Sequence, residues 1–181
     1  MSTLPDRQRE SNALIRTIDV LNVARSGFAG DDSASLIDVL RRHGEVLEHI
    51  PVADERRVRE VIAELLSVVE QDDLDGAVAL LNASMKRYCA PPQLMRHDGW
   101  PWHLHIDRGD DEPLHRWFGA TGAFALANAL AGRSTVPWGV CAADGCQRVF
   151  VHDDRGATRH YCSVACGNRV RVARHRARRC P

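Results

Sequence analysis

The chain has 181 residues, 44% hydrophobic and 27% charged, which fits one ordinary globular domain with a small appendage and excludes a disordered protein. No apolar stretch approaches the roughly 20 residues that cross a bilayer, and the polar start lacks the apolar segment of a secretory signal. We therefore expect a cytoplasmic protein that makes no contact with membranes.

The net charge is zero, yet residues 133–181 hold ten arginines against three aspartates, a charge of +7 that leaves −7 on residues 1–132. This asymmetry predicts a basic tail that binds a polyanion, unless it docks on its own acidic body.

The beginning of the chain shows two stretches of helical periodicity. Residues 1–12 are polar and are expected to fray, and an apolar pattern then starts at Ala13 and stops near Gly27. Ser33 or Ser35 is expected to cap a second helix, which ends before Gly44.

The middle of the chain changes from helical to extended periodicity and back. The clearest helix follows Pro51 and Asp54, and a fourth is expected over residues 74–85. Residues 102–106 then alternate strictly, and a turn at residues 97–99 separates them from a second extended stretch. A fifth helix opens at Glu112-Pro113 and closes near Gly132. These patterns predict a mainly α body with a small β-hairpin (α+β) over residues 1–135, which we expect to fold by itself when cut near Arg133.

Four of the six cysteines lie within 26 residues, as Cys141-x4-Cys146, fifteen intervening residues, and Cys162-x3-Cys166. Two short-spaced pairs supply the four thiolates that a tetrahedral Zn²⁺ ion takes, whereas an iron–sulfur cluster and paired disulfides are the alternatives. Because cysteine fills all four positions and leaves none for water, the sequence predicts one structural zinc rather than a catalytic one. His152 and His160 are possible substitute ligands, although an exposed loop residue and a strand residue are the simpler interpretation.

The residues around the cysteines predict a small module over residues 136–181. Gly145 permits a tight knuckle, and residues 149–151 and 159–161 are expected to be two strands joined by a polar turn at 153–158. Ser163 is expected to cap a helix that starts at Val164 and holds Cys166 in its first turn. Residues 138–141 are interpreted as a short linker from the body.

The last helix has two unlike faces. At 100° per residue Val170, Ala173 and Ala177 share a sector of about 60° with Cys166. The opposite side is arginine, and no acidic residue follows Cys162. Unrelieved repulsion between guanidinium groups favours a polyanionic partner, and the absence of aromatic residues favours duplex over single-stranded nucleic acid. The candidate contacts are Arg169, Arg171, Arg174, Arg176, Arg178 and Arg179, of which Arg171, Arg174 and Arg178 point away from the zinc.

The run from Cys162 through Cys166-Gly167-Asn168-Arg169 resembles the CGNR zinc finger, which is named for its Cys-Gly-Asn-Arg sequence. The upstream residues resemble, in their order of helices and in the Asp98-Gly99-Trp100 turn, the ABATE domain that precedes this finger in bacterial proteins ascribed to stress-induced transcription regulation. The resemblance implies a DNA-binding regulator with the four clustered cysteines on zinc, Arg169 within the signature and Arg171 at the DNA backbone.

The body carries no enzyme motif: it has no nucleophile elbow, no phosphate loop and no His-Glu-x-x-His, so no enzyme is expected. His103 and His105 share one face of the expected strand and offer a metal site with Cys89, although alternating strand histidines are more often structural. Four aromatic residues are expected either to form core or to line a pocket for a small-molecule effector: Trp100, Trp102, Trp117 and Phe118.

Two hypotheses for the function follow from these patterns. The first is a transcription regulator that binds double-stranded DNA through the finger and whose body senses a small molecule or forms a homodimer. The second is a zinc-stabilised interaction module whose arginine helix binds RNA or an acidic protein. Direct binding of duplex DNA distinguishes the two.

Overall fold

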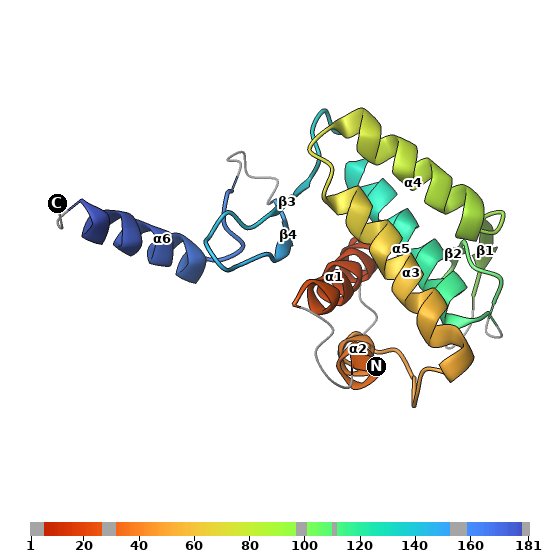
Figure 1. Ribbon diagram of the computed structural model, residues 1–181. Coiled ribbons are helices and arrows are strands. Elements are labelled where there is room, and N and C mark those ends of the chain that lie inside the picture. The colour runs from red at the N-terminus through yellow and green to blue at the C-terminus, as the bar shows by residue number, and fades with distance from the viewer. Residues whose placement is uncertain (1–5, 27–31, 97–100, 110–111, 153–158, 179–181) are drawn as a thin grey trace.

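The computed structural model describes residues 6–26, 32–96, 101–109, 112–152 and 159–178, and shows a helical body from which a small module and a long terminal helix project (Figure 1). The body contains α1 (Asp6–Arg25), α2 (Asp32–Arg42), α3 (Val52–Val69), α4 (Leu74–Tyr88) and α5 (Leu114–Leu130), with a hairpin of β1 (Gln93–Met95) and β2 (His103–His105). The module contains β3 (Trp138–Val140) and β4 (Val149–Val151), and α6 (Val164–Ala177) ends the chain. This confirms the predicted fold class.

Helix α5 lies at the centre of the body, in contact with α1, α3 and α4. Its sequence is apolar on nearly all sides, which suits a helix surrounded by others. Two glycines permit the close approach of its neighbours. A Cβ at Gly119 would lie 2.6 Å from the ring of Tyr88 on α4, and one at Gly122 would lie 2.8 Å from Leu65 on α3. A side chain at either position would force the facing side chain out of its place in the packed core.

Several helix boundaries differ from the sequence prediction. Helix α1 begins at Asp6, inside the segment expected to fray, because Arg, Gln and Glu extend a helix without adding apolar periodicity. Helix α2 begins at Asp32, so Ser33 and Ser35 lie within the helix and do not cap it. Asp54, expected to precede its helix, lies in the first turn of α3. None of the described helices is long and apolar enough to span a bilayer.

The first hairpin is confirmed at shorter length than expected. Strands β1 and β2 pair antiparallel, with Leu94 opposite Leu104. Only three of the five alternating residues, 103–105, belong to the strand. The turn expected at residues 97–99 lies outside the described residues, as does the polar turn at 153–158.

The second hairpin is paired differently from the prediction. Strand β4 forms where expected, but residues 159–161 are not a strand, and β4 pairs instead with β3, the segment interpreted as a linker. Trp138 of β3 and Val149 of β4 are almost fully buried in the core of the body, at 2% exposure each. Phe150, pointing to the other face of β4, packs among the cysteines. The hairpin therefore belongs to two cores at once.

Candidate metal centre and nucleic-acid interface

The four clustered cysteines come together from three segments of the module. Cys141 follows β3, Cys146 ends the knuckle, and Cys162 and Cys166 flank the start of α6. Their sulfur atoms all lie within 4.8 Å of one another. The Sγ of Cys162 is 3.8 Å from that of Cys146 and 3.7 Å from that of Cys166.

This spacing fits a zinc ion. A regular tetrahedron with zinc–sulfur bonds of about 2.3 Å has sulfur–sulfur edges of about 3.8 Å, which the separations of Cys162 from Cys146 and Cys166 match. Four thiolates complete the coordination shell and leave no position for water, so the geometry is that of a structural site. Among the described residues, no other group of three or more histidine, cysteine or acidic side chains converges in this way.

The backbone around the cysteines is arranged by local interactions that the sequence predicts. Gly145 has φ of +69°, a conformation that side-chain-bearing residues rarely adopt, and the amide of Cys146 donates to the carbonyl of Ala143 at 2.8 Å to close the knuckle. Ser163 caps α6, because its Oγ accepts from the amide of Cys166 at 3.2 Å. Cys166 therefore lies in the first turn, where the helix dipole favours a thiolate.

The cysteines of the cluster differ in acidity. The pKa of Cys162 is raised to about 12 by burial and by hydrogen bonds with the neighbouring thiols. Burial also acts to raise the pKa of Cys141, but amide hydrogen bonds from Cys162 and Ala143 lower it to about 7. Zinc binding must therefore displace protons from the cluster, so we expect the affinity for zinc to fall as the pH falls.

The histidines considered as ligands lie outside the sulfur cluster. The ring of His152 packs edge-on against Phe150, with 5.2 Å between centroids, and the carbonyl of His160 accepts from the amide of Ala142 at 2.9 Å. In the body, His103 and His105 face each other, with 2.9 Å between their Nε2 atoms. Cys89 does not complete a three-ligand site with them; its Sγ contacts the carbonyl of Ala120 at 3.8 Å, and burial raises its pKa.

Helix α6 presents its arginines to solvent. The only fully buried residue on it is Cys166, and Figure 1 shows the helix extending away from the body. Arg169 donates to the carbonyl of Asp144 at 3.1 Å and lies 3.8 Å from the Sγ of Cys166, so it braces the knuckle against the helix. Arg171 contacts the side chain of Asn168 at 3.3 Å. Three further arginines are exposed, namely Arg174, Arg176 and Arg178, whereas Arg179 lies outside the described residues.

The aromatic residues considered for a pocket do not gather around one cavity. Phe118 is buried in the core at 2% exposure, and Trp102 is 61% exposed, with Arg96 5.4 Å from its ring centre. Trp117 lines a cavity near the start of α5. Trp100 lies outside the described residues.

Two residues of α1 hold the module against the body, and no sequence pattern predicted a role for either. The side-chain Nδ2 of Asn22 donates to the backbone carbonyl of Val149 at 3.0 Å, and its Oδ1 accepts from the backbone amide of Val149 at 2.7 Å. The Asn22 side chain thus replaces the two hydrogen bonds that a neighbouring strand would make. Arg25 donates to the carbonyl of Gln147 at 2.5 Å and pairs with Glu70. No local pattern signals these contacts, because they join residues more than 120 positions apart.

We expect Asn22→Ala to destabilise the protein by about 1–3 kcal/mol, because it leaves two polar groups of the buried Val149 backbone without partners. Urea unfolding measures the change. Asn12→Ala is the control, since Asn12 is exposed on the same helix and its side chain contacts the ring of His43 rather than the module, so its loss is expected to cost less than that of Asn22. Equal stability of the two variants would show that the contact does not hold the module.

Comparison with known families agrees with this geometry. Residues 138–179 match the CGNR zinc finger, and residues 29–137 match the ABATE family, whose description is "Putative stress-induced transcription regulator". The search of curated proteins found no match. The finger match spans all four cysteines, which form the zinc-binding site of the module. Both families are described in terms of regulation or metal binding and neither as an enzyme.

Proposed function

The chain belongs to the ABATE family and ends in a CGNR zinc finger, and from this premise we propose that it regulates transcription by binding duplex DNA through α6. In this proposal the chain divides into a body, residues 1–135, and a finger, residues 136–181, and it acts in the cytoplasm without catalysing a reaction. The body senses a small molecule or forms a homodimer.

The observation that carries the proposal is the set of exposed arginines on a helix held by the zinc site. The side chains of Arg174, Arg176 and Arg178 make no hydrogen bond or ion pair with any residue that the structure describes. Helix α6 has 14 residues, so at 1.5 Å per residue it is about 21 Å long, and it extends free of the body. A helix of this size and charge fits the major groove of duplex DNA, where guanidinium groups bind phosphates and guanine edges.

The arginines are not equivalent in this proposal. Arg169 is already bound to the knuckle, so its replacement is expected to lower both the stability of the finger and the affinity for DNA. In this proposal Arg171, which follows the cysteine pair on α6, contacts the DNA backbone. Arg174 and Arg178 lie farther along the same face and are the candidates for contacts with bases as well as phosphates.

We expect the triple variant Arg171→Ala, Arg174→Ala, Arg178→Ala to weaken binding to duplex DNA and to reduce the salt slope by roughly one for each arginine that contacts a phosphate. Where an arginine instead contacts a guanine, its single replacement is expected to cost about 1–3 kcal/mol of binding free energy and to relax the preference at that base position. Titration against selected and random duplexes at two salt concentrations measures both effects.

The control removes one positive charge from the body through Arg56→Ala, whose side chain is exposed on α3, and it is matched to the single arginine variants of α6. This variant is expected to bind DNA as the unmodified chain does. If the triple variant also bound as tightly as the unmodified chain, duplex binding by α6 would be wrong. Retained affinity of the unmodified chain for RNA or an acidic protein, with none for duplex DNA, would favour an interaction module instead.

A further inference from the structure

A cavity of about 1000 Å³ opens in the body between the segment after α2, the start of α3 and the start of α5. Its apolar wall includes Leu40, Leu47, Leu114 and Trp117. Binding sites for small molecules occupy about 300–1,000 Å³ and combine such walls with a few polar groups, so the chemistry of those groups indicates the class of ligand.

Two helix N-termini meet at this cavity. Asp54 and Leu65 of α3 contact His115 and Gly122 of α5 in the same order along both helices, so the helices run parallel and begin side by side. Pro51 and Pro113 are the N-cap residues of the two helices, and both line the cavity. Neither proline side chain can accept a hydrogen bond from the first turn of its helix. Helix N-termini carry partial positive charge and amides without intrahelical partners. The amide of His115 in α5 is already bound by Asp54, so the first turn of α3 is the end of the cavity that favours a further negative charge.

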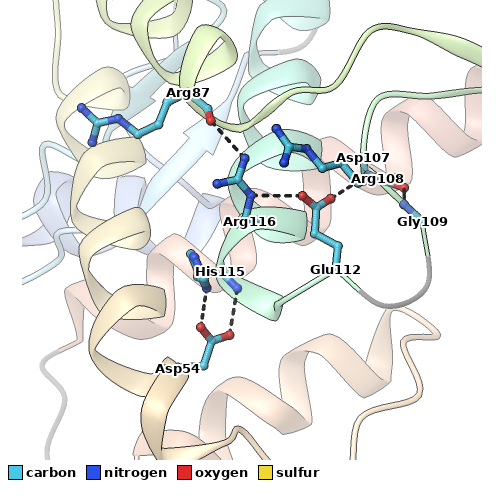
Figure 2. A network of polar contacts seen from close by, with 8 residues as sticks. All are labelled: Asp54, Arg87, Asp107, Arg108, Gly109, Glu112, His115 and Arg116. Carbon is cyan, nitrogen blue, oxygen red and sulfur yellow. Dashed lines mark hydrogen bonds and ion pairs between the residues drawn. The ribbon is translucent and has the colours of Figure 1, made fainter.

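The acidic side chains in the wall are already paired within the protein. Asp54 accepts from the ring and the amide of His115, and Glu112 accepts from the side chain of Arg116 and the amide of Arg108 (Figure 2). The two other carboxylates are paired similarly, Glu45 with Arg16, and Asp107 with His105 and the amide of Gly109. A cationic ligand would have to displace these partners.

One arginine of the wall, by contrast, remains available. Arg57 lies one turn after Asp54, lines the cavity, is exposed, and makes no hydrogen bond or ion pair with a described residue. Behind the wall, the guanidinium of Arg16 lies 4.6 Å from the ring centre of Trp117, and its Nε is buried with no partner among the described residues. A cation already over this ring disfavours a second one in the ligand.

We propose that this cavity binds a small organic carboxylate with an apolar or aromatic body. The carboxylate pairs with Arg57 near the first-turn amides of α3, and the apolar part packs against Trp117 and Leu114. The proposal concerns the body and does not rest on DNA binding by α6. This cavity differs from the pocket expected from the sequence. Of the expected aromatic residues that the structure describes, Trp117 lines the cavity, whereas Trp102 and Phe118 do not.

The test uses the full-length, zinc-loaded protein and two pairs of probes, benzoate with benzamide and indole-3-acetate with indole-3-acetamide. Within each pair the two compounds share the ring, but the carboxylate is negatively charged and the amide is neutral. Benzylamine carries a positive charge on a similar ring. Binding is followed by saturation-transfer NMR and calorimetry at fixed ionic strength in a buffer free of carboxylates. We expect at least one carboxylate to bind more tightly than its amide and benzylamine not to bind. Arg57→Gln is expected to weaken the carboxylate about tenfold, which corresponds to one charge-assisted hydrogen-bonded pair.

Arg56→Gln is the matched control, because Arg56 neighbours Arg57 on α3 but pairs with Glu60 and does not line the cavity. It is expected to leave the affinity unchanged. Three results would overturn the proposal: no binding of either carboxylate, benzylamine binding as well as benzoate, or equal effects of Arg56→Gln and Arg57→Gln. None of these results bears on DNA binding by α6, which is measured separately.

Discussion

Replacing Cys162 with serine is expected to release the zinc and unfold the finger. Its sulfur lies within 3.8 Å of the sulfurs of both Cys146 and Cys166. Zinc contributes about 10–16 kcal/mol to the folding of small zinc modules, and α6 buries only Cys166, so little else stabilises this arginine-rich helix. We therefore expect zinc content to fall from one equivalent to near zero, with loss of the helical signal of α6 and of DNA binding.

The control for this variant is Cys89→Ser, which removes a half-buried thiol outside the cluster and is expected to keep one equivalent of zinc. Metal analysis and circular dichroism measure the two variants together. If Cys162→Ser retained a full equivalent of zinc, or if the unmodified protein contained iron, the assignment of the zinc site would fail.

Replacing Trp138 with alanine is expected to destabilise the body as well as the finger, by about 3–5 kcal/mol. Trp138 belongs to the finger by sequence match, yet its side chain is almost fully buried among residues of the body. For the same reason, a body cut near Arg133 is expected to lose stability, whereas the sequence alone led us to expect that it would fold unimpaired. Urea unfolding followed by the helical signal measures both.

Two further variants test whether lost packing explains the destabilisation expected for Trp138→Ala. Trp138→Phe keeps much of the ring volume and removes an Nε1 that is buried with no partner among the described residues, so it is expected to cost less than the alanine variant. Trp102→Ala removes a tryptophan that is 61% exposed and is expected to change stability little. If Trp138→Ala left the unfolding of the body unchanged, the shared core would be refuted.

The sequence by itself determined the features of the protein that depend on neighbours in the chain. The cysteine spacing fixed the ligand set, because two short loops are enough to surround a zinc ion. Ser163 and Val164 marked the start of α6 correctly, because an N-cap acts within three residues. The 100° step of a helix likewise pointed Arg171, Arg174 and Arg178 away from the zinc, and in the structure they are exposed whereas Cys166 is buried.

The tertiary structure alone decided which distant segments meet. Strand β3 looked like a linker because three residues give too little alternation to identify a strand, and its pairing with β4 depends on the core that Trp138 enters. The contact of Asn22 with Val149 joins side chain and backbone across 127 positions, and the cavity beside Arg57 forms only because α3 and α5 start side by side. Hydrophobic periodicity records that a residue is buried but not which partner buries it, so these features had no signal in the sequence.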